Sequence, residues 1–342
     1  PFAEKLKGRK HGDSAQVFFN YLTSPENRED LLNGLKSPLI RTRRLCIRAL
    51  LDSPNVDKAL ALEQLGREPD PFLRRMIFER LSSLGEAMNE HAHIFLRDKY
   101  PANRVLALRY LYTENPNESV GLDIAMNKLL DKNAAVRGLA REIVAEHNPA
   151  VDFAAYYHSN LEQAVVPALL GLGETGQRSD CEAIEVYLKS MRSNIVAAAI
   201  SALMRLASTQ YADAALELLN HQSVGVVKTA QRLIMKHHVA DYTQVKTLFD
   251  ETPFVHSKIK CATILFNAPK WQKIIYMLQI LSCENEQIRK MGMQAIYKWL
   301  YSFNRSYSQV TLEQREMIEQ LICDLGNQLP KPLARELLFV LK

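Results

Sequence analysis

The chain has 342 residues, of which 47% are apolar and 24% charged, and its formal net charge is +5. This composition is ordinary for a soluble, well-packed protein. No apolar run reaches the roughly 18 residues that would cross a bilayer, and no secretory signal is visible at the start. The chain begins at Pro1 rather than Met, which leaves a leader or an anchor further upstream open.

The excess positive charge lies entirely in the first third of the chain. Residues 1–110 contain 19 Lys and Arg against 14 Asp and Glu, whereas residues 111–342 contain 24 of each. This asymmetry is far weaker than the basic tracts of a dedicated nucleic-acid arm. The cysteines form no CxxC pair, which argues against a cysteine-based zinc site. We expect buried thiols in a reducing, cytoplasmic setting at Cys46, Cys181, Cys261, Cys283 and Cys323.

Taken in chain order, the sequence predicts pairs of amphipathic helices. A first helix is expected near residues 13–22, and the next begins at Ser24 with a cap, a proline at the first helical position and acids in the first turn. The segments that begin at Ser53, Ser179 and Asp241 follow a similar pattern. No segment shows the alternation of a strand.

A second set of helices recurs with a period of about 31 residues. The aligned residues are Ile47, Ile77, Ala107, Ala140, Ala168, Ala199, Ala230, Ala262 and Gly292. The position four residues later is large and apolar, and residues four apart share one helical face. These are Leu51, Leu81, Leu111, Val144, Leu172, Leu203, Ile234, Phe266 and Ile296. Turn or start signals such as Asp70-Pro71 and Tyr100-Pro101 precede the helices.

These helices make about nine pairs between residues 24 and 300. One pair cannot bury both of its faces, so consecutive pairs must stack. We expect residues 1–23 to cap the N-terminal end and residues 301–342 to form a C-terminal helical cap. The last helix pair begins with the capping-box pattern Thr311-x-x-Gln314.

The second helices resemble those of HEAT repeats, which read V-R-x-x-A-x-x-x-L after an Asp or Pro. The segments AAVRGLAREIV, NRVLALRYL and EQIRKMGMQAI match this pattern. The resemblance implies an all-α fold, a right-handed α-α superhelix (α-solenoid) of about nine hairpins that forms one array over residues 1–342. The middle repeats depart from the pattern, because they carry Val165, Val196, Val227 and Ile259 where the family has arginine.

Arginine recurs three residues before the aligned column, at Arg44, Arg74, Arg104, Arg137 and Arg289. The resemblance implies that this arginine reaches an acidic residue at a repeat turn and forms a ladder between repeats. Asp70 and Asp131 are available as partners. The alternative is that these arginines face a ligand.

An arginine stripe is the first candidate binding site. Arg41, Arg44 and Arg48 are spaced to share one helical face. The second helices of HEAT-like arrays line the concave side, so the stripe would continue through Arg74, Arg75, Arg104 and Arg141. Such a surface would suit acidic peptides or phosphates. The alternative is a solvated face with salt bridges between repeats.

An aromatic segment is the second candidate site. It comprises Trp271, Tyr276, Tyr297, Trp299, Tyr301, Phe303 and Tyr307. Together with Arg305, these side chains could stack on bases or bind a peptide. The alternative is that they seal the core where the last repeat meets its cap.

Catalytic, metal and cofactor sites are not expected. Glu90, His91 and His93 point to different helical faces, and the His-Glu pairs of iron-binding HEAT-type hydroxylases are absent. Gly171-Leu172-Gly173 is interpreted as a turn after a helix and not as a nucleotide-binding loop, because no strand precedes it.

The sequence therefore predicts a non-catalytic, monomeric scaffold that presents a concave groove to a protein or peptide, with an acidic segment as one candidate partner. The alternative is a nucleic-acid-binding protein similar to the HEAT-like alkylpurine DNA glycosylases, with the arginines and tryptophans as its contacts. These two groups lie at opposite ends of the array, which counts against one shared site.

Overall fold

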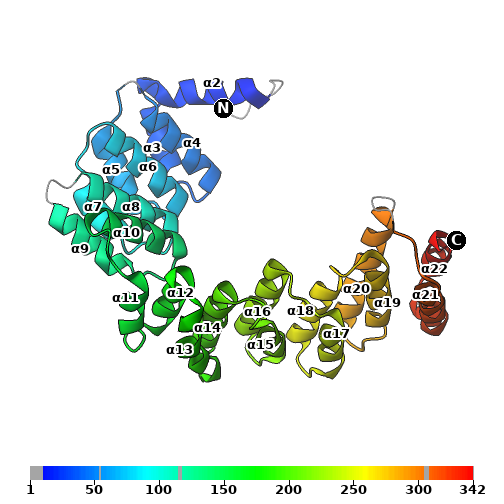
Figure 1. Ribbon diagram of the computed structural model, residues 1–342. Coiled ribbons are helices and arrows are strands. Elements are labelled where there is room, and N and C mark those ends of the chain that lie inside the picture. Colours follow the sequence, from blue (N-terminus) through cyan, green and yellow to red (C-terminus); the bar gives the residue numbers. More distant parts are fainter. Residues whose placement is uncertain (1–10, 54, 115–117, 304–307, 342) are drawn as a thin grey trace. The chain divides into compact units, whose positions relative to one another are not determined.

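The computed structural model describes residues 11–53, 55–114, 118–303 and 308–341. Over these residues the chain forms twenty-one α-helices, α2 to α22, joined by turns and short 3-10 helices, with no strand (Figure 1). The all-α prediction is confirmed. Contacts divide the chain into two compact units, residues 1–151 and 152–342. The superhelix and the single array over residues 1–342 stay predictions.

The N-terminal unit contains nine of these helices. They are α2 (His11–Thr23), α3 (Arg28–Leu35), α4 (Ile40–Leu51), α5 (Lys58–Arg67), α6 (Pro71–Ser83), α7 (Asn89–Phe95), α8 (Pro101–Thr113), α9 (Glu118–Lys128) and α10 (Ala134–His147). The second helices of successive pairs pack side by side in the order α4, α6, α8, α10. The first helices α5, α7 and α9 lie on the other side of the unit (Figure 1).

The C-terminal unit continues the same pairing. Its helices are α11 (Phe153–Ser159), α12 (Val165–Thr175), α13 (Cys181–Glu185), α14 (Ser193–Leu206), α15 (Ala212–Glu217), α16 (Val224–His237), α17 (Tyr242–Glu251), α18 (Val255–Leu265), α19 (Lys270–Ile280), α20 (Glu286–Tyr301), α21 (Leu312–Leu325) and α22 (Lys331–Val340). Here the second helices pack in the order α12, α14, α16, α18, and α21 packs on α19.

Several predicted helix starts are confirmed by their caps. The Asp70 carboxylate accepts the backbone N–H groups of the first turn of α6, Asp241 does the same for α17, and Thr311 forms the expected capping box with Gln314. The start predicted at Ser53 is wrong. Helix α5 begins at Lys58, because the Asp57 side chain lies directly before it and accepts the N–H of Leu60.

The prediction that the Ser24 side chain caps a helix is also wrong. Its hydroxyl caps no helix, and Pro25 opens a short 3-10 helix, Pro25–Asn27, ahead of α3. A further correction concerns Gly171-Leu172-Gly173, which lies within α12 and not in a turn after it. Glycine is needed there because a Cβ at Gly173 would lie 2.6 Å from the Cα of Ala202, so α12 and α14 approach closely.

The predicted column of small or β-branched residues is buried at all nine positions, and the large residue four positions later is buried at every position except the half-buried Phe266. The alignment is one residue out in α4 and α18 and three residues out in α12, where the seventh position is Gly171 and not Ala168. Counted from the residue that precedes each helix, the seventh position is Ala in α8, α10, α14 and α16 but Cys46 in α4 and Cys261 in α18. Both cysteines are 1% exposed, so they take the small, buried place in the repeat.

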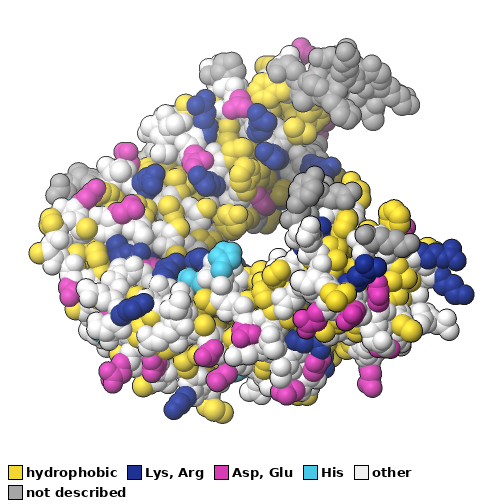
Figure 2. Space-filling view, turned by 45° about the vertical axis from the view of Figure 1, so that its right-hand side comes forward, with side chains coloured by type: hydrophobic (Ala, Val, Ile, Leu, Met, Phe, Trp, Pro, Cys, Tyr) yellow, Lys and Arg dark blue, Asp and Glu magenta, His cyan; other side chains and the backbone are white. Residues whose placement is uncertain are grey.

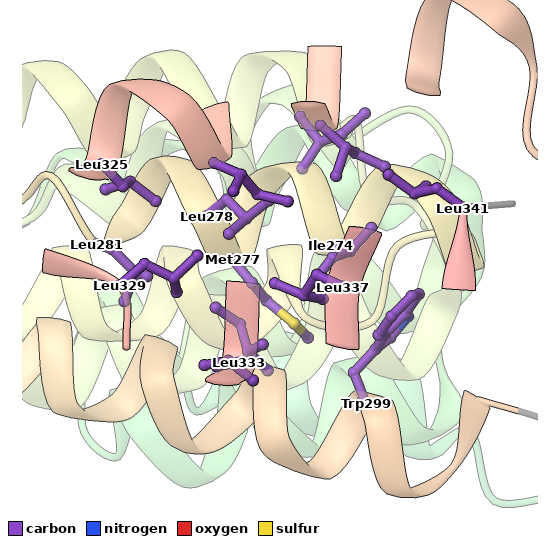
Figure 3. Close-up of a cluster of buried hydrophobic side chains, with 14 of the residues drawn as sticks. Ile274, Met277, Leu278, Leu281, Trp299, Leu325, Leu329, Leu333, Leu337 and Leu341 are labelled. Carbon is purple, nitrogen blue, oxygen red and sulfur yellow. The ribbon is translucent and has the colours of Figure 1, made fainter. Parts of the chain in front are cut away.

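The last two helices close the C-terminal unit with their own core. Leu325, Leu329, Leu333, Leu337 and Leu341 are buried and lie over the side chains of α19 and α20 (Figure 3). This arrangement fits the predicted helical cap, because leucines at successive turns put one apolar face against the preceding pair. Over the described residues, every helix is too short or too polar to cross a lipid bilayer.

Candidate binding surfaces

Arginine at the fourth helical position forms the same local contact in five second helices. Its Nη1 donates to the carbonyl oxygen six residues earlier, in the turn that precedes the helix. The distances are 2.8 Å for Arg43, 3.0 Å for Arg74, 2.8 Å for Arg104, 2.6 Å for Arg137 and 2.9 Å for Arg289. The guanidinium group thus satisfies backbone acceptors that the turn leaves without helical partners.

Arg43, Arg74 and Arg104 also pair with a carboxylate of the following helix pair. The N–O distances are 3.0 Å for Arg43 to Glu68, 2.5 Å for Arg74 to Asp98, and 2.7 Å for Arg104 to Asp131. The carbonyls of Glu68, Asp98 and Asp131 are in turn the acceptors of Arg74, Arg104 and Arg137. We call this connected set, from Arg43 to Arg137, the arginine ladder.

The three carboxylates of the ladder occupy the same position in the turn before each following helix. Each of these carboxylates lies three residues before the first residue of the next helix. It accepts a hydrogen bond from the backbone N–H two residues later, in the pairs Glu68 with Asp70, Asp98 with Tyr100 and Asp131 with Asn133. One carboxylate therefore fixes a turn and joins two repeats. The predicted partner Asp131 is confirmed, whereas Asp70 is wrong, because its carboxylate caps α6.

The electrostatics of the ladder favour the ionised carboxylates. Burial alone would raise the pKa of Asp131, but hydrogen bonds from Arg104 and from the Asn133 backbone outweigh it, so the pKa lies below its usual value. The pKa of Asp98 is lowered in the same way, where hydrogen bonds from Asn103, Tyr100 and Arg74 outweigh burial.

Arg44 was predicted to belong to the ladder, and the structure corrects this by one residue. Helix α4 is preceded by Leu39, so its fourth residue is Arg43, whose side chain is 11% exposed and binds Glu68 through Nε and Nη2. Arg44 is exposed and its guanidinium lies over the ring of Phe72, 5.3 Å from the centroid.

The exposed face of α4 carries Arg41, Arg44 and Arg48, as the predicted stripe requires. Within the described part of the chain, none of the three has a carboxylate within ion-pair distance. Leu45 is 40% exposed between them, and Phe72 on the neighbouring helix α6 is 52% exposed. We call Arg41, Arg44, Leu45, Arg48 and Phe72 the α4 surface. In Figure 2, Lys and Arg side chains lie among hydrophobic ones on the N-terminal unit.

The other predicted stripe residues are placed differently. The guanidinium groups of Arg74 and Arg104 belong to the ladder, and the Arg104 side chain is only 4% exposed. Arg75 forms a surface ion pair with Glu79, with an N–O distance of 2.8 Å. Arg141 is half-buried and engaged in an interaction of its own. The structure therefore brings only the three arginines of α4 together on an open face.

The tryptophans of the aromatic segment lie in the core of the C-terminal unit. Trp271 and Trp299 are 6% and 5% exposed and contact each other and Phe303 edge to face. Their indole N–H groups donate to the backbone carbonyls of Ser308 and Lys270. The interpretation that they seal the core is therefore confirmed for these rings.

Two tyrosines of the same segment, Tyr297 and Tyr301, are exposed. Tyr297 and Tyr301, 51% and 85% exposed, line a cavity of about 890 Å³ together with Phe339 of α22. Tyr276 is buried on α19. The predicted residues Arg305 and Tyr307 lie outside the described residues.

Three of the five cysteines are buried as predicted, namely Cys46, Cys181 and Cys261. Burial raises the pKa of Cys46 to about 11 and that of Cys261 to about 12. The prediction is wrong for Cys323, which is exposed on α21, and Cys283 is intermediate. Among the described residues, no three His, Cys, Asp or Glu side chains gather as metal ligands.

Sequence reasoning missed Glu68 and Asp98 as ladder partners. A signal for them exists, because both share the spacing of Asp131 relative to the following helix. It also missed a cavity of about 1040 Å³ along α7, which depends on tertiary structure. Comparison of the chain with family models and with curated proteins finds no match.

Proposed function

We propose that this protein is a non-catalytic binding module built of HEAT-like repeats, and that its α4 surface binds an acidic segment of a partner protein. The observation that carries the proposal is the contrast between Arg43 and its neighbours. The guanidinium group of Arg43 binds Glu68 within the arginine ladder. In contrast, Arg41, Arg44 and Arg48 are exposed and have no carboxylate partner among the described residues.

The chemistry of the α4 surface favours a protein segment over a simple anion. Guanidinium groups bind carboxylates in a bidentate manner. Leu45 and Phe72 add exposed apolar area between and beside the arginines, and arginine and aromatic residues are enriched at interface hot spots. A partner with alternating acidic and apolar side chains satisfies both parts of the surface.

The repeat architecture supports this proposal. The arginines at the fourth helical position, the buried column of small or β-branched residues and the side-by-side second helices are the features expected of HEAT-like pairs. Repeat arrays of this kind present extended surfaces made of consecutive helices. The nucleic-acid alternative rested in part on the tryptophans, and their burial leaves Trp271 and Trp299 without an open face on which bases could stack.

The test is affinity capture with three versions of the protein. The variant Arg41→Glu/Arg44→Glu/Arg48→Glu reverses the α4 charges, and Arg192→Glu/Lys228→Glu/Arg232→Glu makes the same charge change on exposed positions of the other unit. We expect wild type and the control variant to retain a common set of acidic proteins that the α4 variant loses. Capture of the same set by all three versions would overturn the proposal.

Titration with duplex DNA at two salt concentrations addresses the alternative. Phosphate contacts weaken steeply with salt. We expect that wild type shows no salt-sensitive binding to DNA that depends on the three arginines of α4. If the α4 variant lost tight, salt-dependent DNA binding while protein capture remained unchanged, nucleic acid and not protein would be the ligand.

A further inference from the structure

A second candidate site lies on the other side of the N-terminal unit, along the first helices. A cavity of about 1040 Å³ runs over α7, between the end of α5 and the end of α9. Helix α7 has seven residues, whereas α5 has ten and α9 has eleven, so a short helix stands between two longer ones. We call the cavity the α7 groove. Its open lining includes His93, Ile94, Arg97, Lys99, Ile124 and Lys128.

The charge of the α7 groove is positive once its internal pairs are taken into account. Its two carboxylates are already bound, Glu68 by Arg43 and Asp98 by Arg74. Arg97 and Lys99 are exposed, and within the described residues neither has an ion-pair partner. The groove therefore holds cations whose charge nothing within the described chain neutralises.

Lys128 adds a third cation at the wall of the groove. It is half-buried, and its Nζ donates to the carbonyl oxygen of Leu96 at 2.8 Å. An ammonium group has three donors, and a carbonyl carries no compensating charge. Burial lowers the pKa of Lys128, and repulsion from Arg104 and Arg97 lowers it further against the attraction of Asp131. An anion in the groove would relieve this repulsion.

Apolar side chains in the same groove distinguish among anionic ligands. Ile94 is 67% exposed and Ile124 is half-buried, so both offer aliphatic surface next to the cations. The lining contains the ring of Phe95, which is 3% exposed and stacks on Phe78, and the imidazole rings of His91 and His93, of which His93 is exposed. Because Phe95 is buried, only these imidazoles could stack on a base, whereas the aliphatic side chains lie beside the cations and complement a peptide with aliphatic side chains.

We propose that the α7 groove binds an acidic peptide segment of a protein partner, with carboxylates at Arg97, Lys99 and Lys128 and an aliphatic side chain at Ile94. The inference rests on the proposed function, because it assigns a second surface to the same binding module. The two surfaces lie on different helix layers of one unit, so one elongated partner or two separate segments can use them.

The experiment is a methyl NMR titration of the full chain labelled at isoleucine δ1 carbons. The probe is the peptide Glu-Glu-Leu-Glu-Glu-Leu-Glu-Glu, and the control peptide has Gln in place of every Glu. Ile94 and Ile124 report on the α7 groove, and Ile40, 47% exposed at the start of α4, reports on the α4 surface. Substitutions Ile94→Val, Ile124→Val and Ile40→Val assign the signals.

We expect the acidic peptide, and not its Gln control, to shift Ile94 and Ile124. Arg97→Glu/Lys99→Glu should weaken this binding about tenfold or more, because charge-assisted hydrogen bonds are lost. The control is Lys132→Glu. Lys132 lies two residues before the first residue of α10, as Lys99 lies two residues before the first residue of α8, but Lys132 is outside the groove.

Each alternative outcome has a separate meaning. Shifts at Ile40 with none at Ile94 and Ile124 would overturn the α7 groove and leave the proposed function standing. Shifts at none of the three methyls would overturn the groove proposal, while the capture experiment would still decide the proposed function. Stronger shifts at Ile94 with a twelve-residue thymidine oligonucleotide than with the peptide would assign the groove to nucleic acid and reject the peptide.

Discussion

Arg104 donates to both carboxylate oxygens of Asp131, and both side chains are more than nine-tenths buried. Removal of one partner leaves the other charge buried and unpaired. We therefore expect Arg104→Ala to lower the free energy of unfolding by about 3 to 5 kcal/mol. Arg44→Ala on the exposed α4 surface should change it by less than about 0.5 kcal/mol. Urea denaturation followed by circular dichroism measures both, and equal effects would contradict the ladder.

The ladder also predicts a direction for the dependence of stability on pH. The pKa values of Asp98 and Asp131 are lower in the folded chain than in the unfolded chain. Their contribution is complete above the ordinary carboxyl pKa of about 4 and is lost as the pH falls through the lowered folded values. Unfolding free energies between pH 7 and pH 3 should fall below about pH 4, and Asp131→Asn should reduce that slope. A flat profile would show that the two carboxylates contribute nothing.

At the scale of the element, the contact between α12 and α14 depends on glycine. A Cβ at Gly173 would lie 2.6 Å from the Cα of Ala202, which is backbone and cannot rotate away. Gly173→Ala should therefore push the helices apart and cost about 1 to 3 kcal/mol. Gly138 lies within α10 with open space at its Cβ position.

Gly138→Ala is the matched control for this prediction. It should raise stability by about 0.5 to 1 kcal/mol, because alanine favours the helix and meets no neighbour. Thermal unfolding of both variants separates close packing from helix propensity. If both substitutions stabilised the protein equally, the close approach of α12 and α14 would be wrong.

The sequence predicts the helix pairs well because every pair repeats the same packing requirement. A small or β-branched residue followed four positions later by a large apolar one is visible in nine helices, and these positions are buried except for the half-buried Phe266. The register of α4 was one residue out, because RTRR offers three arginines within four residues and the residue before the helix is Leu39, which has no capping side chain. The α7 groove could not be predicted from the sequence, because it depends on the lengths and packing of three separate helices.

At the scale of the whole molecule, contacts divide the chain into two compact units. The C-terminal unit contains its own core, which α21 and α22 close with a row of leucines. Because the helices of this unit pack mainly on neighbouring helices, a unit with several helix pairs and its own core can fold alone. We expect the fragment 152–342 to be helical and to unfold cooperatively.

Circular dichroism and urea titration of this fragment check the prediction, with the full chain as the reference. A fragment that lacked helical signal, or that lost it gradually without a transition, would show that the C-terminal unit needs residues 1–151 to fold. The charge distribution belongs to the same scale: the excess of Lys and Arg lies in residues 1–110, which contain the α4 surface and most of the α7 groove.

The place of the cysteines in the repeat has a practical consequence for spectroscopy. Thiol reagents attack the thiolate, and the raised pKa values of the buried Cys46 and Cys261 keep them protonated near neutral pH. With Cys283 replaced by serine, a maleimide dye should couple mainly to the exposed Cys323. The chain thus offers a nearly single attachment site on α21, remote in sequence from both proposed surfaces, for fluorescence measurements of ligand binding.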